Sequence, residues 1–295
     1  MGLATAAGPG QWMVSLDAKR SLRDLGMRSD MIKTMHRAFK ERGQDRGIAD
    51  YAIDSDTVSS PIIGRLVDKG LHDELVGEAY AVIDGTDGRA HYVRFKGIEA
   101  FAHAPPIGGI VEVRRFGGPD DPRPTLVLAN RSDIDLDQQV TAPGATWLDH
   151  RLVQRELMPL AMGGFGREAR DALAARVEHL AAEGLARRQG QRIILQRDLL
   201  ATLRRRELDT AGAKMSTETG LPYVPAAVGE HVAGTYRQRL TLTSGRFAMI
   251  DNGLGFALVP WTSTLESHFG RHVSGVAKDG GGIEWGFGRK RGPEI

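Results

Sequence analysis

Apolar residues in the second half of the chain recur at helical spacing and then give way to two short alternating runs. Leu173, Val177 and Leu180 fall on one face of a helix, because they are separated by four and three residues. Gly184 breaks this pattern, and the runs 185–186 and 192–195 flank a short polar turn. A helix, a glycine break and a two-stranded hairpin are typical of the back half of a winged helix. We therefore expect a wing at residues 184–195.

Residues 2–16 carry the same signature at the very start of the sequence. Gly2-Leu3-Ala4 resembles Gly184-Leu185-Ala186, a turn follows at 8–10, and Gln11-Trp12-Met13-Val14 forms the second run. No helical pattern comes before this wing. The sequence therefore opens in the middle of a unit that it later shows whole.

Further periodic segments predict helices and strands along the rest of the chain. A short helix is expected to end at Gly26, and Ser29 and Asp30 are expected to cap a second helix that includes Met31, Met35 and other apolar residues up to 39. Residues 43–60 are polar and predict a connection, and 119–124 predict an exposed loop. Later helices are expected at 147–158, 167–183 and 197–219.

Short β-patterned runs separated by Gly and Pro turns predict small barrel-like units. The expected strands lie at 61–67, 79–83, 91–95, 109–113, 125–128, 236–243, 246–250 and 254–259.

The two β regions also align on each other. Gly77 and Gly88 have the same separation as Gly234 and Gly245, with alternating apolar residues between them. We interpret the chain as two copies of one order, a wing, a helix and a small antiparallel β-unit. A chance match of short glycine patterns is the alternative. The expected fold is thus α+β with two modules, each combining winged-helix elements with a barrel-like unit, at residues 1–140 and 141–295.

Composition places the chain among globular proteins without disulfides. Of its 295 residues, 41% are hydrophobic and 26% are charged, and there is no cysteine. No apolar run reaches the roughly 18–20 residues that cross a bilayer, and no signal-peptide pattern opens the sequence. We therefore expect a cytoplasmic protein that does not insert into a membrane.

Positive charge is concentrated in one part of the chain. The formal net charge is only +2, but residues 151–207 contain twelve Arg against seven Asp and Glu. Basic faces attract phosphates without reading sequence. The alternative for each cluster is a solvated helix face.

Candidate DNA contacts follow from this distribution. Arginines on the expected wing and on the next helix can reach a DNA backbone, and an aromatic and basic tail suits single-stranded DNA. The alternative for the tail is that Trp285 and Phe287 fill a core and the basic residues are solvated. The candidates are Arg187, Arg188, Arg192, Arg204, Arg205, Arg206, Trp285, Arg289, Lys290 and Arg291.

The sequence shows no catalytic constellation, so we assign no catalytic residue, metal or cofactor. His268 and His272 are four residues apart, but Gly270 between them weakens the helix that would align them. The glycine-rich run 286–292 has no following Gly-Lys-Ser/Thr, so it does not predict a phosphate loop.

Several runs resemble one family, and together they cover nearly the whole chain. The family is the uncharacterised C-terminal region that is attached to conjugative relaxase and mobilisation nucleases. The matching runs are AGPGQW at 7–12, IKTMHR at 32–37, TAPGATWLD at 141–149, GLARRQGQR at 184–192, SGRFAMI at 244–250 and the tail at 285–292.

The resemblance implies a non-catalytic part of a relaxase-like protein that acts in conjugative plasmid transfer or mobilisation. In that family the nicking domain lies upstream and uses a tyrosine and a histidine-rich metal site, which this chain lacks. We interpret Met1 as an internal methionine of a longer relative. The expected partner is DNA near the transfer origin. The alternatives are a module that docks the relaxase onto the transfer or secretion machinery, a non-functional remnant, or an unrecognised enzyme.

Overall fold

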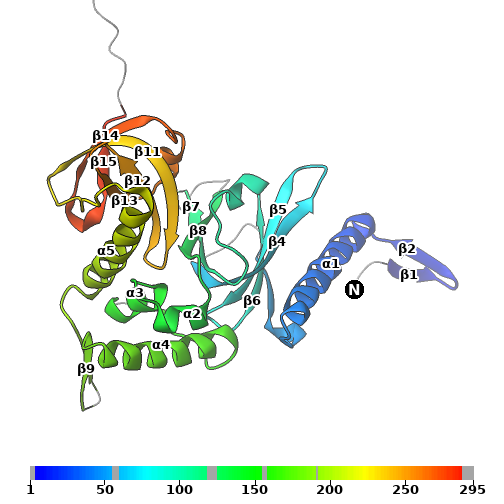
Figure 1. Ribbon diagram of the computed structural model, residues 1–295. Helices are drawn as coiled ribbons and strands as arrows, with labels where there is room; N and C mark the ends of the chain where they lie inside the picture. The colour runs from blue at the N-terminus through cyan, green and yellow to red at the C-terminus, as the bar shows by residue number, and fades with distance from the viewer. Residues whose placement is uncertain (1–3, 55–59, 118–124, 155–157, 191, 288–295) are drawn as a thin grey trace, which may run out of the picture. The chain divides into compact units, whose positions relative to one another are not determined.

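The computed structural model describes residues 4–54, 60–117, 125–154, 158–190 and 192–287 (Figure 1). The chain forms two compact units. Unit 1 comprises residues 1–129 and 159–168, and unit 2 comprises residues 130–158 and 169–295. Each unit combines helices with a largely antiparallel sheet, so the expected α+β class is confirmed. In the described part of the chain, no helix has the length and apolar character needed to span a bilayer.

Unit 1 begins with a hairpin and a long helix, followed by a six-stranded sheet in the order β3-β6-β5-β4-β7-β8. Its elements are β1(Ala4–Gly8), β2(Gln11–Val14), α1(Ala18–Glu41), β3(Tyr51–Asp54), β4(Ile62–Asp73), β5(Glu78–Gly85), β6(Ala90–Phe95), β7(Ile110–Phe116) and β8(Thr125–Ser132), the last of which ends in the residues assigned to unit 2.

Apolar residues cover both faces of the unit 1 sheet. Successive strand residues point to opposite faces, so Val82 packs beneath α1 while Ile83 packs on the other side. The second half of α1 supplies Met35 and Phe39 to the first face, and Phe101 from a short 3₁₀ turn covers the second. The sheet is therefore a buried central layer, and only the second half of α1 packs against it.

Unit 2 contains a group of helices, a hairpin, a long helix and a five-stranded sheet in the order β13-β12-β11-β14-β15. Its elements are α2(Leu136–Thr141), α3(Trp147–Val153), α4(Gly164–Ala182), whose first turn is assigned to unit 1, β9(Ala186–Gln189), β10(Arg192–Leu195), α5(Leu199–Thr219), β11(His231–Leu242), β12(Gly245–Asp251), β13(Phe256–Pro260), α6(Ser263–Glu266), β14(His272–Ala277) and β15(Ile283–Trp285).

The two units repeat one architecture. Each has a hairpin, a helix of more than twenty residues and then a sheet whose strands follow the same order, because β6-β5-β4-β7-β8 corresponds to β13-β12-β11-β14-β15. The first long strand of each sheet carries a bulge at the same place, after Leu66 in β4 and after Tyr236 in β11. The predicted order of a two-stranded hairpin, a helix and a β-unit is confirmed in both halves.

Equivalent glycines lie where two neighbouring strands approach each other closely in both sheets. A Cβ at Gly64 would lie 2.2 Å from the carbonyl oxygen of Asp84, and a Cβ at Gly234 would lie 2.4 Å from that of Asp251. Only glycine allows such an approach of two backbones. The structural repeat therefore pairs Gly64 with Gly234 and Asp84 with Asp251, rather than the glycines that align by sequence spacing.

Three expectations about the elements are wrong. Helix α1 continues through Gly26 instead of ending there, because one glycine costs only about 1 kcal/mol while a break would leave two sets of unpaired backbone groups. The sheets do not close into barrels, since their described orders end at separate edge strands. Residues 51–54 of the expected connection form β3, which pairs in parallel with β6. The expected loop at 119–124 lies outside the described residues.

Candidate nucleic-acid interface

The hairpin β9–β10 forms where the sequence predicts a wing. Helix α4 ends before Gly184, whose φ of +74° favours glycine, and the Leu185 amide donates to the Leu180 carbonyl at 2.8 Å. The strands then pair antiparallel around Gly190, which also has a positive φ of 61°. The hairpin is tied back to the helix because the Gln196 amide donates to the Leu185 carbonyl at 2.8 Å.

The three hairpin arginines are exposed but do not share one face. Arg187 and Arg188 are neighbours in β9 and therefore point to opposite sides. Arg192 lies opposite Gln189, which puts it on the same side as Arg187. Arg188 forms an ion pair with Glu178 of α4. Arg187 and Arg192 are thus the pair that one phosphate backbone can meet together.

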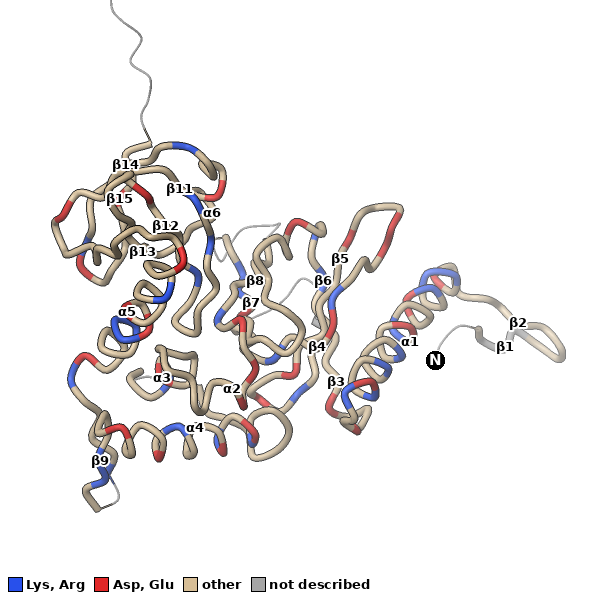
Figure 2. The backbone as a smooth tube through the Cα atoms, viewed as in Figure 1, with Lys and Arg blue, Asp and Glu red and all other residues tan. Residues whose placement is uncertain are grey.

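The three arginines at the start of α5 diverge, because consecutive helical residues are about 100° apart. Arg205 is exposed, and Arg206 lies 3.7 Å from a carboxylate oxygen of Glu183. Arg204 is half-buried, and its Nη1 donates to the Gly280 carbonyl at 3.2 Å. Of these three candidate DNA contacts, Arg204 is therefore the least exposed, and its guanidinium is bound to the protein backbone. Figure 2 shows the basic positions of β9 and of the first half of α5.

Trp285 and Phe287, near the end of the described residues, pack against the core of unit 2. Trp285 is half-buried and stacks on Phe287 with ring centroids 6.0 Å apart, and Phe287 stacks on His268 at 4.2 Å. Both aromatic rings pack against the cluster that contains Tyr236. The remaining candidates, Arg289, Lys290 and Arg291, lie outside the described residues.

A buried arginine that sequence reasoning missed holds the loop before α3. Arg176 is fully buried, and its guanidinium donates to both carboxylate oxygens of Asp149, at 2.9 and 2.8 Å. It also donates to the carbonyls of Val140, Ala142 and Gly144 at 2.8–3.1 Å. Its burial could have been predicted from its position, because Arg176 is four residues from both Ala172 and Leu180 and therefore lies in the apolar stripe of α4.

The same loop is closed by a helix cap. Thr146 Oγ1 accepts from the Asp149 amide at 3.4 Å, and Asp149 Oδ2 accepts from the Thr146 amide at 2.8 Å, which completes a capping box at the start of α3. The run TAPGATWLD, one of the runs behind the family resemblance, therefore has a structural role in placing α3.

Unit 1 contains a second buried charge network around Asp84. The Asp84 carboxylate pairs with Arg46 and, at 3.0 Å, with Arg65, which also binds Glu168 at 2.8 Å. Burial raises the pKa of Asp84 more than the two guanidinium groups lower it. The Arg65 guanidinium also lies 4.9 Å from the ring centroid of Phe165. The network ties the segment 159–168 to the sheet.

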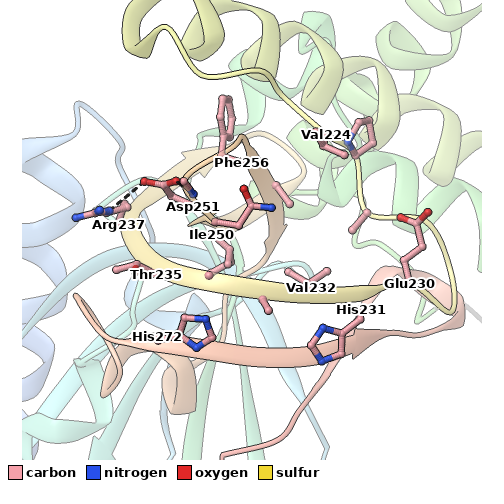
Figure 3. Close-up of a pocket in the computed structure, with 17 residues that line it drawn as sticks. Val224, Glu230, His231, Val232, Thr235, Arg237, Ile250, Asp251, Phe256 and His272 are labelled. Carbon is pink, nitrogen blue, oxygen red and sulfur yellow. Dashed lines mark hydrogen bonds and ion pairs between the residues drawn. The ribbon is translucent and has the colours of Figure 1, made fainter.

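In unit 2, the equivalent place is a cavity of about 610 Å³ (Figure 3). Asp251 is the counterpart of Asp84, and Thr235 takes the place of Arg65. The Asp251 carboxylate accepts from Arg237 Nε at 3.2 Å and from the Gly253 amide at 2.7 Å. Both carboxylate oxygens accept hydrogen bonds from the protein, so Asp251 forms part of the cavity wall in a fixed orientation.

The cavity also carries two histidines and a glutamate. His231 lies on β11 and His272 on β14, and Figure 3 shows them along the same side of the cavity. Glu230 Oε2 accepts from the Ala227 amide at 2.9 Å. Across the described residues, no three His, Cys, Asp or Glu side chains gather as a metal-binding group. The cavity is thus lined by several polar side chains, whereas the β9–β10 hairpin presents exposed arginines.

The family described as Protein of unknown function (DUF3363) matches residues 1–125 and 120–294. No curated protein and no solved structure matches the chain. The family match extends over both units and over both hairpin–helix–sheet repeats. The chain therefore belongs to the DUF3363 family of proteins of unknown function.

Proposed function

We propose that this chain is a non-catalytic DNA-binding module whose contact surface is the hairpin β9–β10 with the start of α5. The observation that carries the proposal is the placement of Arg187 and Arg192 on one side of an exposed two-stranded hairpin. Arg205, also exposed, lies on the helix that follows the hairpin directly. A β-ribbon of this kind can follow a DNA groove or backbone.

The expected binding is dominated by phosphates. Guanidinium groups bind phosphate oxygens through two parallel hydrogen bonds, and each neutralised phosphate releases counterions from the DNA. Arg188 and Arg206 already face Glu178 and Glu183, so they contribute less than Arg187 and Arg192. We therefore expect modest affinity, strong salt dependence and little sequence preference from this surface.

The resemblance to the C-terminal region of relaxase-like proteins supplies the biological setting of the proposal. Such a module would hold DNA near a transfer origin during plasmid mobilisation, and strand nicking would belong to another domain. The buried positions of Tyr80, Tyr92 and Tyr236 accord with a non-catalytic role, because each ring packs within its own unit.

A salt series of DNA binding tests the proposal. The full chain is titrated into a labelled 20-base-pair duplex and a labelled 20-nucleotide single strand, with fluorescence anisotropy as the readout. The variant Arg187→Glu/Arg192→Glu is expected to weaken duplex binding at least 10-fold at about 50 mM salt. It should also reduce the slope of log K against log salt by about 1.8, since each phosphate contact contributes about 0.9.

A matched control separates the hairpin from overall charge. Lys214→Glu/Arg271→Glu makes the same change in net charge at two exposed positions away from the hairpin. This control is expected to retain most of the binding and the full slope. Equal losses in both variants, or no binding at about 50 mM salt, would overturn the proposal.

A further inference from the structure

A set of large apolar side chains lies exposed on the hairpin of unit 1 and on the first half of α1. We refer to this set as the unit 1 apolar face. Single exposed apolar residues are ordinary, but several on neighbouring elements indicate an interaction surface. Trp12 and Val14 share one side of β2, and Leu22 and Leu25 share one side of α1. The members of the face are Trp12, Val14, Leu16, Leu22 and Leu25.

The first half of α1 is covered far less than the second. Within residues 18–30, Ala18 is buried and Ser21 is half-buried, and the other side chains are exposed. From Met31 onwards the helix packs on the sheet through Met35 and Phe39. A helical segment of about 13 residues is marginal in water without tertiary packing. The exposed half therefore lacks the support that the sheet gives to the rest of α1.

The internal repeat identifies the same positions in unit 2. Both hairpins are followed by a three-residue turn that ends in an aspartate, so Val14 corresponds to Leu195 and Leu22 to Leu203. Val14 and Leu22 are 64% and 56% exposed, whereas Leu203 is 1% exposed and Leu195 is half-buried. The positions of Val14 and Leu22 are therefore covered in unit 2 and uncovered in unit 1, whereas Ile193, the counterpart of Trp12, is 44% exposed.

Helices cover these two positions in unit 2. Leu195 and Leu203 pack in one cluster with Leu180 and Ala181 of α4 and with Leu152 of α3. The second half of α5 packs on its own sheet through Met215, as the second half of α1 does in unit 1. Helix α5 thus contacts a sheet with one half and other helices with the other, whereas α1 contacts a sheet with its second half.

Charges next to the unit 1 apolar face restrict its occupant. Lys19, Arg20, Arg23 and Arg28 are exposed around it, against Asp17 and Asp24, while the third acidic residue, Asp30, pairs with Lys33 at 3.1 Å. Two copies of this face would bring like charges together. A helix with acidic residues beside its apolar stripe would complement them.

We infer that the unit 1 apolar face is a docking surface for an amphipathic helix from outside these 295 residues. This helix presents leucine and alanine side chains to Val14 and Leu22 and acidic residues to the flanking cations. It occupies the position that α4 holds against β9–β10 and α5 in unit 2. The inference is independent of DNA binding, because it concerns the other hairpin.

A graft of the covering helix onto the full chain tests this inference. A copy of residues 169–183 is joined directly ahead of Gly2, because Gly184 follows that segment in the sequence as Gly2 would follow the graft. Hydrogen exchange with mass spectrometry then follows the amides of residues 11–28. Docking is expected to slow their exchange at least 10-fold relative to the unextended chain, since the exposed turns gain tertiary contacts.

Matched variants keep the result specific to the face. The same graft with Leu180→Glu in the grafted copy, and the normal graft with Leu22→Glu in α1, are both expected to leave exchange at the level of the unextended chain. Leu22 is exposed, so its substitution does not threaten folding. Unchanged exchange in the original graft, or equal slowing in all three chains, overturns the inference.

The other possible occupants are measured on the unextended chain. Light scattering reports self-association, and sedimentation with phosphatidylcholine–phosphatidylserine vesicles reports membrane binding. We expect that Leu22→Glu changes neither the self-association nor the vesicle binding of the chain. A dimer, or a vesicle-bound fraction, that Leu22→Glu abolishes would assign the face to a second copy or to a lipid surface and would overturn the inference.

Discussion

Replacing the buried Arg176 with methionine gives the sharpest test of how unit 2 is held together. Arg176→Met keeps an unbranched side chain of similar length but removes every hydrogen bond of the guanidinium group. Asp149 loses both of its contacts to Arg176, and the carbonyls of Val140, Ala142 and Gly144 lose their donor. Asp149 is itself fully buried, so its charge would remain without a compensating cation.

The expected cost is large because the surviving carboxylate cannot reach water without opening the loop. Removing one partner of a buried ion pair costs about 3–5 kcal/mol, in contrast to the small effect of a surface pair. With a urea m-value of about 2 kcal/mol/M for a unit of this size, a loss of about 4 kcal/mol lowers the midpoint of unit 2 by about 2 M.

Urea titration followed by tryptophan fluorescence measures this shift. Trp147 begins α3 and is buried beside the loop, so its emission reports the affected region. The double variant Arg176→Met/Asp149→Asn removes the unpaired charge but keeps an acceptor for the Thr146 cap. It is expected to recover part of the lost stability. A midpoint shift below about 0.5 M for Arg176→Met, or a further loss in the double variant, would refute the reasoning.

Three further measurements test the packing of the sheets. Gly234→Ala should destabilise unit 2 by about 1–3 kcal/mol in urea titrations, because its Cβ would lie 2.4 Å from the Asp251 carbonyl oxygen. Gly253→Ala is the control, because Gly253 has a positive φ but no atom near its Cβ position, so it reports backbone strain without the steric clash. Burial, reinforced by Arg94, lowers the pKa of His72, so the folded state disfavours its protonation; stability should fall as pH drops below about 6.5, and His72→Gln should flatten this dependence. Burial raises the pKa of all five tyrosines, so absorbance at 295 nm should show less phenolate at pH 10 in the folded protein than in the unfolded chain. The pKa rises to about 12 for Tyr80, Tyr223 and Tyr236.

Local patterns predict the hairpins of this protein well. Gly190 supplies a positive φ between two short alternating runs, so the turn and both strands follow from a few neighbouring residues. The same reasoning finds β5–β6 and β11–β12. It fails at Gly26, where the cost of a glycine within a helix is smaller than the cost of two new helix ends.

The candidate site is less predictable from sequence. The pattern places Arg187 and Arg192 on a hairpin, but their common side depends on the strand register. Arg204 has the same sequence signal as Arg205, yet a glycine carbonyl 76 residues away binds its guanidinium. Such differences depend on contacts with residues that are distant in sequence, so they cannot be predicted from local periodicity.

By itself, the sequence determines that one order of hairpin, helix and β-strands occurs twice, because turn glycines and apolar periodicity act over a few residues. The tertiary structure alone decides that the sheets stay open, that Arg176 is buried against Asp149, and that Leu203 is covered while Leu22 is exposed. These outcomes depend on which surfaces meet in space, and equivalent residues such as Leu22 and Leu203 have the same local pattern in both settings. Burial is a property of the packed unit, so two copies of one signal lead to two different surfaces.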